Sequence, residues 1–207
     1  MEKNAILKAI VAVCGLTWVA ALVVARTVPA SWSLLAPFSL VVSVAGGAVW
    51  LLDRWLWSWR LIRLVVKRPD LRGTWHGEIA SEWVAPQANA AGPPIAAIVV
   101  LTQTATSLHL RQLTAESESI TLAATIIDEV DEAKAVVGVY RNEPQSRVRG
   151  QSPIHLGALR LRVGADDELT GEYWTDRNTR GQLTLRRFSK EKAKSFAHAQ
   201  KLAAQKP

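Results

Sequence analysis

The sequence predicts an N-terminal two-helix transmembrane hairpin, then an all-β domain that closes into an eight-stranded up-and-down β-barrel, and a short C-terminal helix. Three observations support this fold class. Residues 1–66 are nearly all apolar and hold six of the nine tryptophans. Residues 67–207 carry most of the charge and alternate apolar and polar side chains, which is typical of strands. Turn-forming residues interrupt this alternation at short intervals. We therefore expect three regions, at residues 1–68, 69–188 and 189–207.

Two uncharged runs, Ala9–Ala25 and Thr27–Leu52, predict the hairpin. A helix needs roughly 20 apolar residues to cross a bilayer core about 30 Å thick, so we expect spans at about residues 6–25 and 32–52. The first run could instead be a secretory signal peptide, because basic residues precede it. A second long apolar run follows at once, and the first has no clear small-x-small cleavage site before a polar region, which favours the hairpin.

The placement of basic residues predicts that both termini are cytoplasmic. Lys3 and Lys8 precede the first span, and Arg26 is the only basic residue of the connecting turn. Five basic residues follow the second span: Arg54, Arg60, Arg63, Lys67 and Arg68. In the segment Asp53–Lys67 tryptophans are interleaved with these residues. The segment is either an amphipathic helix at the membrane interface or a continuation of the second helix into water.

Small residues recur with a spacing of four on both predicted helices and let helix backbones approach closely in lipid. They are Thr17, Ala21 and Ala25 on the first helix, and Ser39, Ser43 and Gly47 on the second. These ridges fit two interpretations, packing within the hairpin or contact between protomers.

Pro69 ends the helical region, and period-two alternation follows it. We expect strands at Gly73–Trp83, Ile95–Thr104, Ser107–Thr114, Ser119–Glu129, Ala135–Asn142, His155–Val163, Glu168–Asp176 and Gly181–Phe188. Short connections and the need to remove exposed edges favour closure into a barrel. Eight strands enclose just enough interior for side chains or one small ligand. The strand faces carry too many charges for an outer-membrane barrel. The tail Ser189–Pro207 is basic and rich in alanine, and predicts a solvated helix capped by Ser189.

Composition excludes several classes of site. The net charge of +7 favours an acidic partner such as a phosphate, a nucleotide or an anionic lipid. The single cysteine, Cys14, permits no intrachain disulfide and no cysteine-based zinc site. Common hydrolase, metalloprotease and phosphate-loop motifs do not occur. Nothing marks Asp176 and His155 as a hydrolytic pair, so we expect a binding protein without a cofactor or metal and not an enzyme.

Polar and aromatic residues gather where several predicted strands end. The alternation places Tyr140 and Asn142 on one strand face and Tyr173 and Thr175 on another. If these faces point inward, the barrel mouth suits a nucleotide, because rings stack on bases, amides and hydroxyls read base edges, and Arg177 pairs with phosphate. The alternative is that the tyrosines and threonines are ordinary strand formers and Arg177 is an exposed turn residue.

Six segments resemble a known bacterial family. They are residues 69–83, 103–107, 114–119, 140–144, His155-Leu156-Gly157, and 171–181 with the sequence Gly-Glu-Tyr-Trp-Thr-Asp-Arg-Asn-Thr-Arg-Gly. Together with the hairpin, they resemble the SMODS-associated effector with two transmembrane helices and a β-strand-rich domain. This is the CD-NTase-associated cyclic nucleotide receptor of CBASS anti-phage systems. In this sequence Leu156 stands where we expect an aromatic residue between the histidine and the glycine.

The resemblance implies a lipocalin-like barrel that binds a cyclic dinucleotide made by a CD-NTase encoded nearby. It implies a multi-pass protein of the bacterial inner membrane that has no DNA or RNA partner. Binding is expected to promote homo-oligomerisation, and the clustered hairpins then disrupt the lipid bilayer and kill the infected cell. Ser39, Ser43 and Gly47 are the expected contacts between hairpins.

On this hypothesis we expect Arg177 to bind phosphate and Tyr140 and Tyr173 to stack on bases. The expected polar and secondary contacts are Asn142, Thr175, Thr179, His155 and Trp75. Two other functions remain open, a membrane-tethered carrier for an apolar ligand and a protein-interaction scaffold. Salt would weaken the binding of a dinucleotide but not that of an apolar ligand.

Overall fold

The structure is a computed structural model in which two compact units are distinguished, residues 1–70 with 104–106, and residues 71–103 with 107–207. It describes residues 2–27, 36–59, 62, 67–82, 90, 92–130 and 133–204. Each unit is considered by itself.

The first unit contains two helices, α1 (Glu2–Thr27) and α2 (Ala36–Arg54), which pack against each other. The start of the second predicted span and most of the predicted turn lie in residues 28–35, outside the described residues, whereas Arg26, expected in the turn, lies in α1. Pro37 falls in the first turn of α2, where its missing N–H has no intrahelical partner to lose. Within the described residues no helix reaches the length and apolarity that crossing a bilayer requires.

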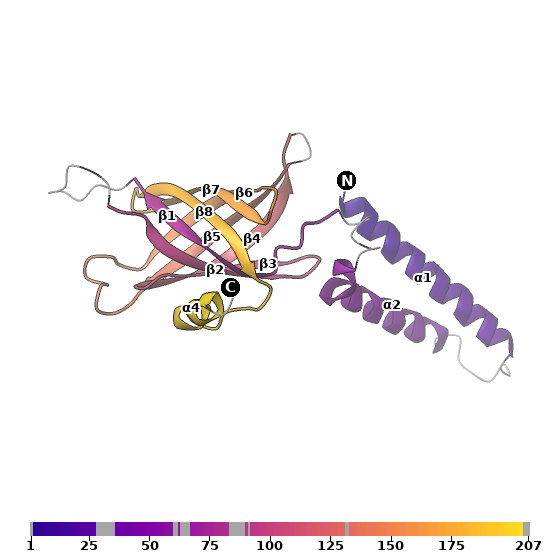
Figure 1. Cartoon of the computed structure of the whole chain (residues 1–207). Coiled ribbons are helices and arrows are strands. Elements are labelled where there is room, and N and C mark those ends of the chain that lie inside the picture. The colour runs from indigo at the N-terminus through magenta and orange to yellow at the C-terminus, as the bar shows by residue number, and fades with distance from the viewer. Residues whose placement is uncertain are drawn as a thin grey trace. The chain divides into compact units, whose positions relative to one another are not determined.

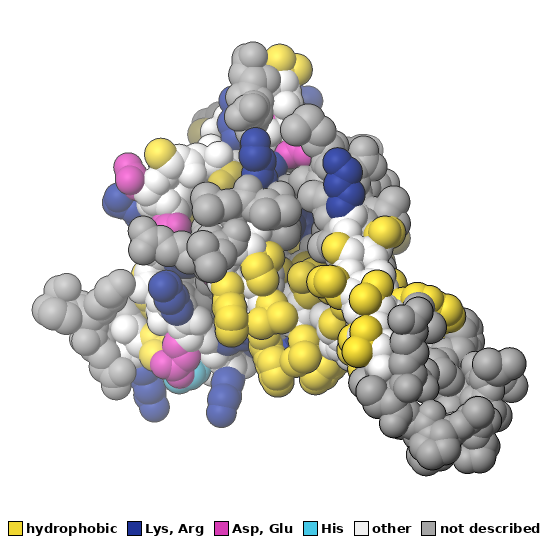
Figure 2. All heavy atoms as spheres, turned by 90° about the vertical axis from the view of Figure 1, so that its right-hand side faces the viewer, with side chains coloured by type: hydrophobic (Ala, Val, Ile, Leu, Met, Phe, Trp, Pro, Cys, Tyr) yellow, Lys and Arg dark blue, Asp and Glu magenta, His cyan; other side chains and the backbone are white. Residues whose placement is uncertain are grey.

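The small-residue ridges of the two helices differ in exposure. Ala21 of α1 is buried, whereas Ser39, Ser43 and Gly47 of α2 are exposed. A Cβ built on Gly47 would meet no atom within 4 Å. The ridge on α2 is therefore not used to pack the hairpin. Large apolar side chains are also exposed, among them Leu16 at 73%, and hydrophobic side chains gather on the face shown in Figure 2.

The segment after α2 is not a continuation of that helix. The helix ends at Arg54, and a short 3-10 turn, η1 (Leu56–Ser58), follows. Trp57 is fully buried, while Trp59 is exposed. The Asp53 carboxylate accepts hydrogen bonds from the hydroxyl groups of Thr104, at 3.0 Å, and Thr106, at 2.8 Å, within the same unit. The predicted interfacial helix extends into residues 60–66, most of which lie outside the described residues.

The second unit is a closed antiparallel barrel in which each strand pairs with its sequence neighbour and the last with the first, as predicted (Figure 1). The strands are β1 (Gly73–Ser81), β2 (Ile95–Gln103), β3 (Leu108–Leu113), β4 (Ser117–Asp128), β5 (Lys134–Pro144), β6 (His155–Val163), β7 (Glu168–Thr175) and β8 (Arg180–Ser189). Their ends lie within two residues of the predicted ones.

The barrel has two ends, which differ in the connections they carry. One end carries the β1–β2, β3–β4, β5–β6 and β7–β8 connections, and we call it the mouth. We call the opposite end, where β1 begins and β8 finishes, the base. Buried apolar side chains fill the base half of the interior, among them Leu71, Trp75, Leu101, Leu161 and Leu169. Buried polar side chains lie at both ends, Gln103 near the base and Ser119, Thr121 and Asn142 toward the mouth.

The C-terminal helix differs from the prediction in its start and in its surroundings. Strand β8 continues through Ser189, and the helix α4 (Phe196–Ala204) begins seven residues later. The Ser195 hydroxyl accepts a hydrogen bond from the N–H of His198 at 3.1 Å, so Ser195 and not Ser189 caps the helix. The tail is not simply solvated, because Ala193 and Ala199 are buried in a cluster on the outer face of β2 and β3: Ile98, Val100, Leu113, Ala193 and Ala199.

Candidate ligand-binding site at the barrel mouth

Seven of the eight predicted ligand residues lie at the mouth. They are Tyr140 and Asn142 near the end of β5, His155 at the start of β6, Tyr173 and Thr175 at the end of β7, and Arg177 and Thr179 in the β7–β8 turn. The eighth, Trp75, does not join them. It is the third residue of β1, which starts at the base, and it is 1% exposed within the base core. Its placement gives no support to the predicted ligand contact.

The strand register sets the mouth residues in rows. One row consists of directly paired neighbours on four successive strands: Gln112, Ser119, Asn142 and His155. The next row toward the base contains Thr121, Tyr140, Gly157 and Thr175. The alternating burial of β5 shows that Tyr140 and Asn142 face inward, because Arg141 and Glu143 between and beyond them are exposed.

Each mouth tyrosine is paired with a glycine on the next strand. Tyr140 lies opposite Gly157, and Tyr173 lies opposite Gly181. A Cβ on Gly157 would come within 2.8 Å of Cε2 of Tyr140 and closer to the end of its ring, and a Cβ on Gly181 would come within 2.9 Å of Cε1 of Tyr173. The absence of a side chain thus lets each ring lie across the neighbouring backbone. Gly157, the last residue of the His155-Leu156-Gly157 segment, has this packing role.

Tyr140 is a neutral phenol in this environment. Its side chain is 8% exposed, and burial raises the pKa of its hydroxyl group; the negative charges of Tyr173, when ionised, and of Asp176 add to the effect. Among the described residues the Tyr140 hydroxyl has no hydrogen-bond partner. It therefore offers a proton to any acceptor that enters the mouth.

The two threonines of the β7–β8 turn are engaged with each other. Their hydroxyl oxygens lie 2.6 Å apart, and the hydroxyl of Thr175 also donates to the carbonyl of Thr179 at 3.3 Å. Asn178 between them adopts a left-handed backbone conformation with φ of 57°. Thr175 and Thr179 thus shape the turn that carries Arg177.

Arg177 is exposed and contacts two polar side chains, Ser152 and His155. Its Nη1 donates to the Ser152 hydroxyl at 2.9 Å and lies 3.4 Å from Nδ1 of His155. Within the described part of the chain no carboxylate lies within 4.0 Å of its guanidinium group. By contrast, Arg141 pairs with Glu143 at 3.0 Å and Arg147 with Glu116 at 3.4 Å. The positive charge of Arg177 is therefore open to an anion.

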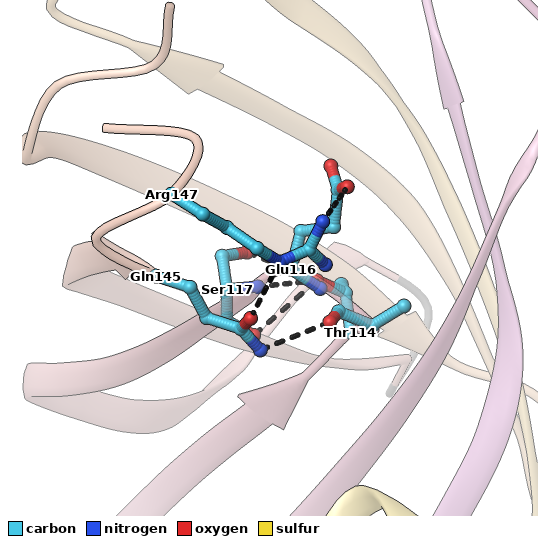
Figure 3. A network of polar contacts seen from close by, with 6 residues as sticks. Thr114, Glu116, Ser117, Gln145 and Arg147 are labelled. Atoms are coloured by element: carbon cyan, nitrogen blue, oxygen red, sulfur yellow. Dashed lines mark hydrogen bonds and ion pairs between the residues drawn. The ribbon is translucent and has the colours of Figure 1, made fainter. Parts of the chain in front are cut away.

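A polar network links two connections at the rim of the mouth (Figure 3). Arg147 of the β5–β6 loop contacts Glu116 of the β3–β4 turn and donates from Nε to Oε1 of Gln145 at 3.1 Å. Gln145 in turn donates from Nε2 to the carbonyl of Ala115 at 3.0 Å. Exposed pairs of this kind add little stability, but they fix the two connections beside each other.

The interior below the mouth is almost filled. A cavity of about 10 Å³ remains among Gln112, Ser119, Thr121, Tyr140 and neighbouring apolar residues, which is room for a single water molecule. Pockets for drug-sized ligands measure about 300–1,000 Å³. This cavity by itself is too small to hold a nucleotide.

Three polar residues of this site were not among the predicted contacts: Gln112, Ser119 and Ser152. The alternation in β3 and β4 could have found the first two, since each shares the inward face of its strand. Ser152 lies in the β5–β6 loop, where no periodicity exists to mark it. Among the described residues no group of three His, Cys, Asp or Glu side chains is placed to hold a metal ion.

Comparison with known proteins agrees with the resemblance found in the sequence. Residues 66–187, the barrel and a few residues before it, match the family described as Cap15, cyclic dinucleotide receptor domain. The CD-NTase-associated protein 15 of Staphylococcus schleiferi is 29% identical over 143 residues, which cover 66% of this chain and 70% of that protein. The family is defined by a receptor domain, in agreement with the expectation of a binding protein and not an enzyme. The chain thus belongs to the Cap15 cyclic dinucleotide receptor family.

Proposed function

We propose that this protein is a membrane-anchored effector of a CBASS anti-phage system whose barrel mouth binds a cyclic dinucleotide. The observation that carries the proposal is the convergence of seven predicted contacts at one end of the barrel, above a filled apolar core. Family membership and the relative's name, CD-NTase-associated protein 15, support the same ligand class.

The geometry supports distinct roles for the mouth residues. Arg177 binds a phosphate, since none of the described carboxylates pairs with its charge. The rings of Tyr140 and Tyr173 pack against Gly157 and Gly181, which supports a role in stacking on bases. Asn142 reads a base edge, and His155 beside it is a further polar contact. Thr175 and Thr179 act by holding the turn of Arg177.

Ligand binding then promotes homo-oligomerisation and disruption of the bacterial inner membrane, with both termini cytoplasmic. The uncharged runs of the first 52 residues and the exposed apolar side chains of α1 and α2 support insertion into lipid. The exposed ridge of Ser39, Ser43 and Gly47 leaves room for a second helix. A ligand drives such assembly only if it binds the assembled form more tightly than the free one.

Titration of the detergent-solubilised full chain with cyclic dinucleotides tests the ligand. We expect Arg177→Ala to raise Kd at least about tenfold, because a charge-assisted bond to phosphate is lost. Arg162→Ala is the matched control, since this arginine lies near the base and contacts Glu129 at 3.5 Å. Binding should also weaken with added salt. Arg177→Ala protein that binds as tightly as the wild type removes Arg177 from the site.

A separate assay tests the effector step. Cells that express the chain should admit a membrane-impermeant dye only when a cyclic dinucleotide is supplied. Gly47→Leu should reduce dye entry without changing Kd, because a bulky side chain keeps helices apart. Dye entry that is independent of the nucleotide would contradict the proposed coupling while leaving the binding site intact.

A further inference from the structure

We propose that Asp53, in the last turn of α2, is a positioning residue that binds the β2–β3 turn and thereby couples nucleotide binding in the barrel to the action of the helical hairpin. This inference rests on the proposed function, in which ligand binding leads to disruption of the membrane. It assigns a role to Thr104 and Thr106. Both lie in the segment 103–107, one of the six that resemble the family, which supplies none of the predicted ligand contacts.

The Asp53 side chain binds both threonines of the turn. Its Oδ1 accepts hydrogen bonds from the hydroxyl group of Thr104 at 3.0 Å, from the hydroxyl group of Thr106 at 2.8 Å and from the backbone N–H of Thr106 at 2.9 Å. An ionised carboxylate can only accept, so it sets the direction of all three bonds. Hydrogen bonds to an ionised acceptor are also stronger than those between neutral groups.

The main chain of the turn is bound as well. The N–H of Ala105 donates to the backbone carbonyl of Asp53 at 3.0 Å, and the carbonyl of Ala105 accepts a hydrogen bond from the guanidinium group of Arg68. Ala105 is 1% exposed, so the centre of the turn is shielded from water. Asp53 and Arg68, one before and one after the segment that joins α2 to the barrel, therefore hold the same turn.

The turn is continuous with two strands of the barrel. Residues 104–106 belong to the same compact unit as α1 and α2, although β2 ends at Gln103 and β3 begins at Leu108. Strand β3 runs from this turn to the mouth, where Gln112 pairs with Ser119 in the row that holds Asn142. A change in β3 at the mouth can therefore reach the end of α2 through one short strand.

The proposed effector step requires such a connection. A ligand shifts the hairpins toward a membrane-disrupting assembly only if a coupling free energy links its binding to that assembly. Hydrogen-bond networks and rigid secondary structure can carry coupling of this kind. The bonds of Asp53 to Thr104 and Thr106 join such a network to a strand, so their loss should separate ligand binding from the effector step.

Two measurements on the full chain test this inference. Isothermal titration with cyclic di-GMP, cyclic di-AMP and cyclic GMP-AMP gives Kd for chains dispersed singly in detergent micelles, where they cannot assemble. Dye release from vesicles of phosphatidylethanolamine and phosphatidylglycerol that carry the chain then measures the effector step with the nucleotide that binds. Asp53→Ala should lower nucleotide-dependent release at least about fivefold, the lower end of typical coupling. Its Kd should stay close to the wild-type value, because the mouth is intact.

Variants of the turn test the same contact from its other side. Thr106→Val removes a hydroxyl donor to Asp53 and should also lower release, whereas Thr106→Ser keeps the hydroxyl group and should retain wild-type release. Asp128→Ala is the matched control, because this carboxylate lies at another connection of the base and contacts Lys134 of β5. Its Kd and its dye release should both equal those of the wild type.

Several results would overturn the role of Asp53. One is wild-type dye release from the Asp53→Ala protein, and another is a Kd that rises enough to account for the lost release. Release from this variant without nucleotide would also overturn it, because Asp53 would then restrain the hairpin and not transmit binding. A wild type that binds none of the three nucleotides, or that binds without releasing dye, would contradict the proposed function and the coupling with it.

Discussion

The two ends of the barrel interior use polar side chains in opposite ways. At the base, the amide oxygen of Gln103 accepts a hydrogen bond from the N–H of Leu71 at 2.8 Å, and Nε1 of Trp75 donates to the carbonyl of Leu71 at 2.9 Å. At the mouth, the hydroxyl of Tyr140 and Nδ2 of Asn142 have no partner among the described residues. Buried polar groups are normally satisfied within the protein. These open groups distinguish the mouth from the base.

The largest expected effect is a loss of protein stability when a buried residue of the base is truncated. Trp75→Ala removes a ring that is 1% exposed and that has the guanidinium group of Arg187 5.4 Å from its centroid. Such truncations cost about 3–5 kcal/mol, so the free energy of unfolding should fall by that amount in urea denaturation of the detergent-solubilised protein. The Kd of the variant protein that remains folded should stay within twofold of the wild-type value. A larger change in Kd would mean that Trp75 contacts the ligand after all.

A substitution that disturbs the packing of Tyr140 on Gly157 should have the next largest effect on stability and affinity. A methyl group at Gly157 would clash with the ring, and overpacking of this kind costs about 1–3 kcal/mol. Gly157→Ala should therefore lower both stability and affinity. Gly164→Ala, whose Cβ would meet its nearest atom at 3.5 Å, is the control. Combining Gly157→Ala with Tyr140→Ala should remove most of the added cost, and simple additivity would contradict the contact.

The side-chain amides of Gln103, at the base, and Asn142, at the mouth, allow a direct comparison of the two ends of the barrel. Gln103→Ala leaves the buried N–H of Leu71 without its bond, which costs about 1–3 kcal/mol, and it should not affect Kd. Asn142→Ala should cost less stability, about 1 kcal/mol for one lost hydrogen bond, but raise Kd several-fold. Thermal melts and titrations of both variants measure the difference. Equal effects on affinity would remove the distinction between base and mouth.

The smallest expected effect is a dependence on alkaline pH. The folded protein holds the Tyr140 proton more tightly than the unfolded chain, because burial raises its pKa. Its contribution to stability is therefore complete below the ordinary pKa of about 10 and is lost as the pH rises above that value, by about 1.4 kcal/mol per pH unit. Tyr140→Phe should lose stability less steeply between pH 10 and 11. Parallel pH profiles would contradict the burial of an unpaired phenol.

The helical unit was predicted only in part. Uncharged runs predicted two helices, and α1 and α2 correspond to them. Charge and hydropathy did not predict that α2 ends at Arg54, before the tryptophan-rich segment, because they carry no signal for the 3-10 turn that follows. Nor could they decide which small residues pack the hairpin. That depends on which side of each helix faces the other, and it leaves Ala21 buried and Gly47 exposed.

The sequence by itself determined the eight strands and their order, because alternation and turn residues act locally. The motifs at the strand ends also identified the family. Only the tertiary structure decided which inward residues meet. Alternation assigns a side chain to a face but not to a partner across the strand, which depends on register. Strand register therefore places Ser119 opposite Asn142 and Gly157 opposite Tyr140, and the fold places Trp75 in the core at the base.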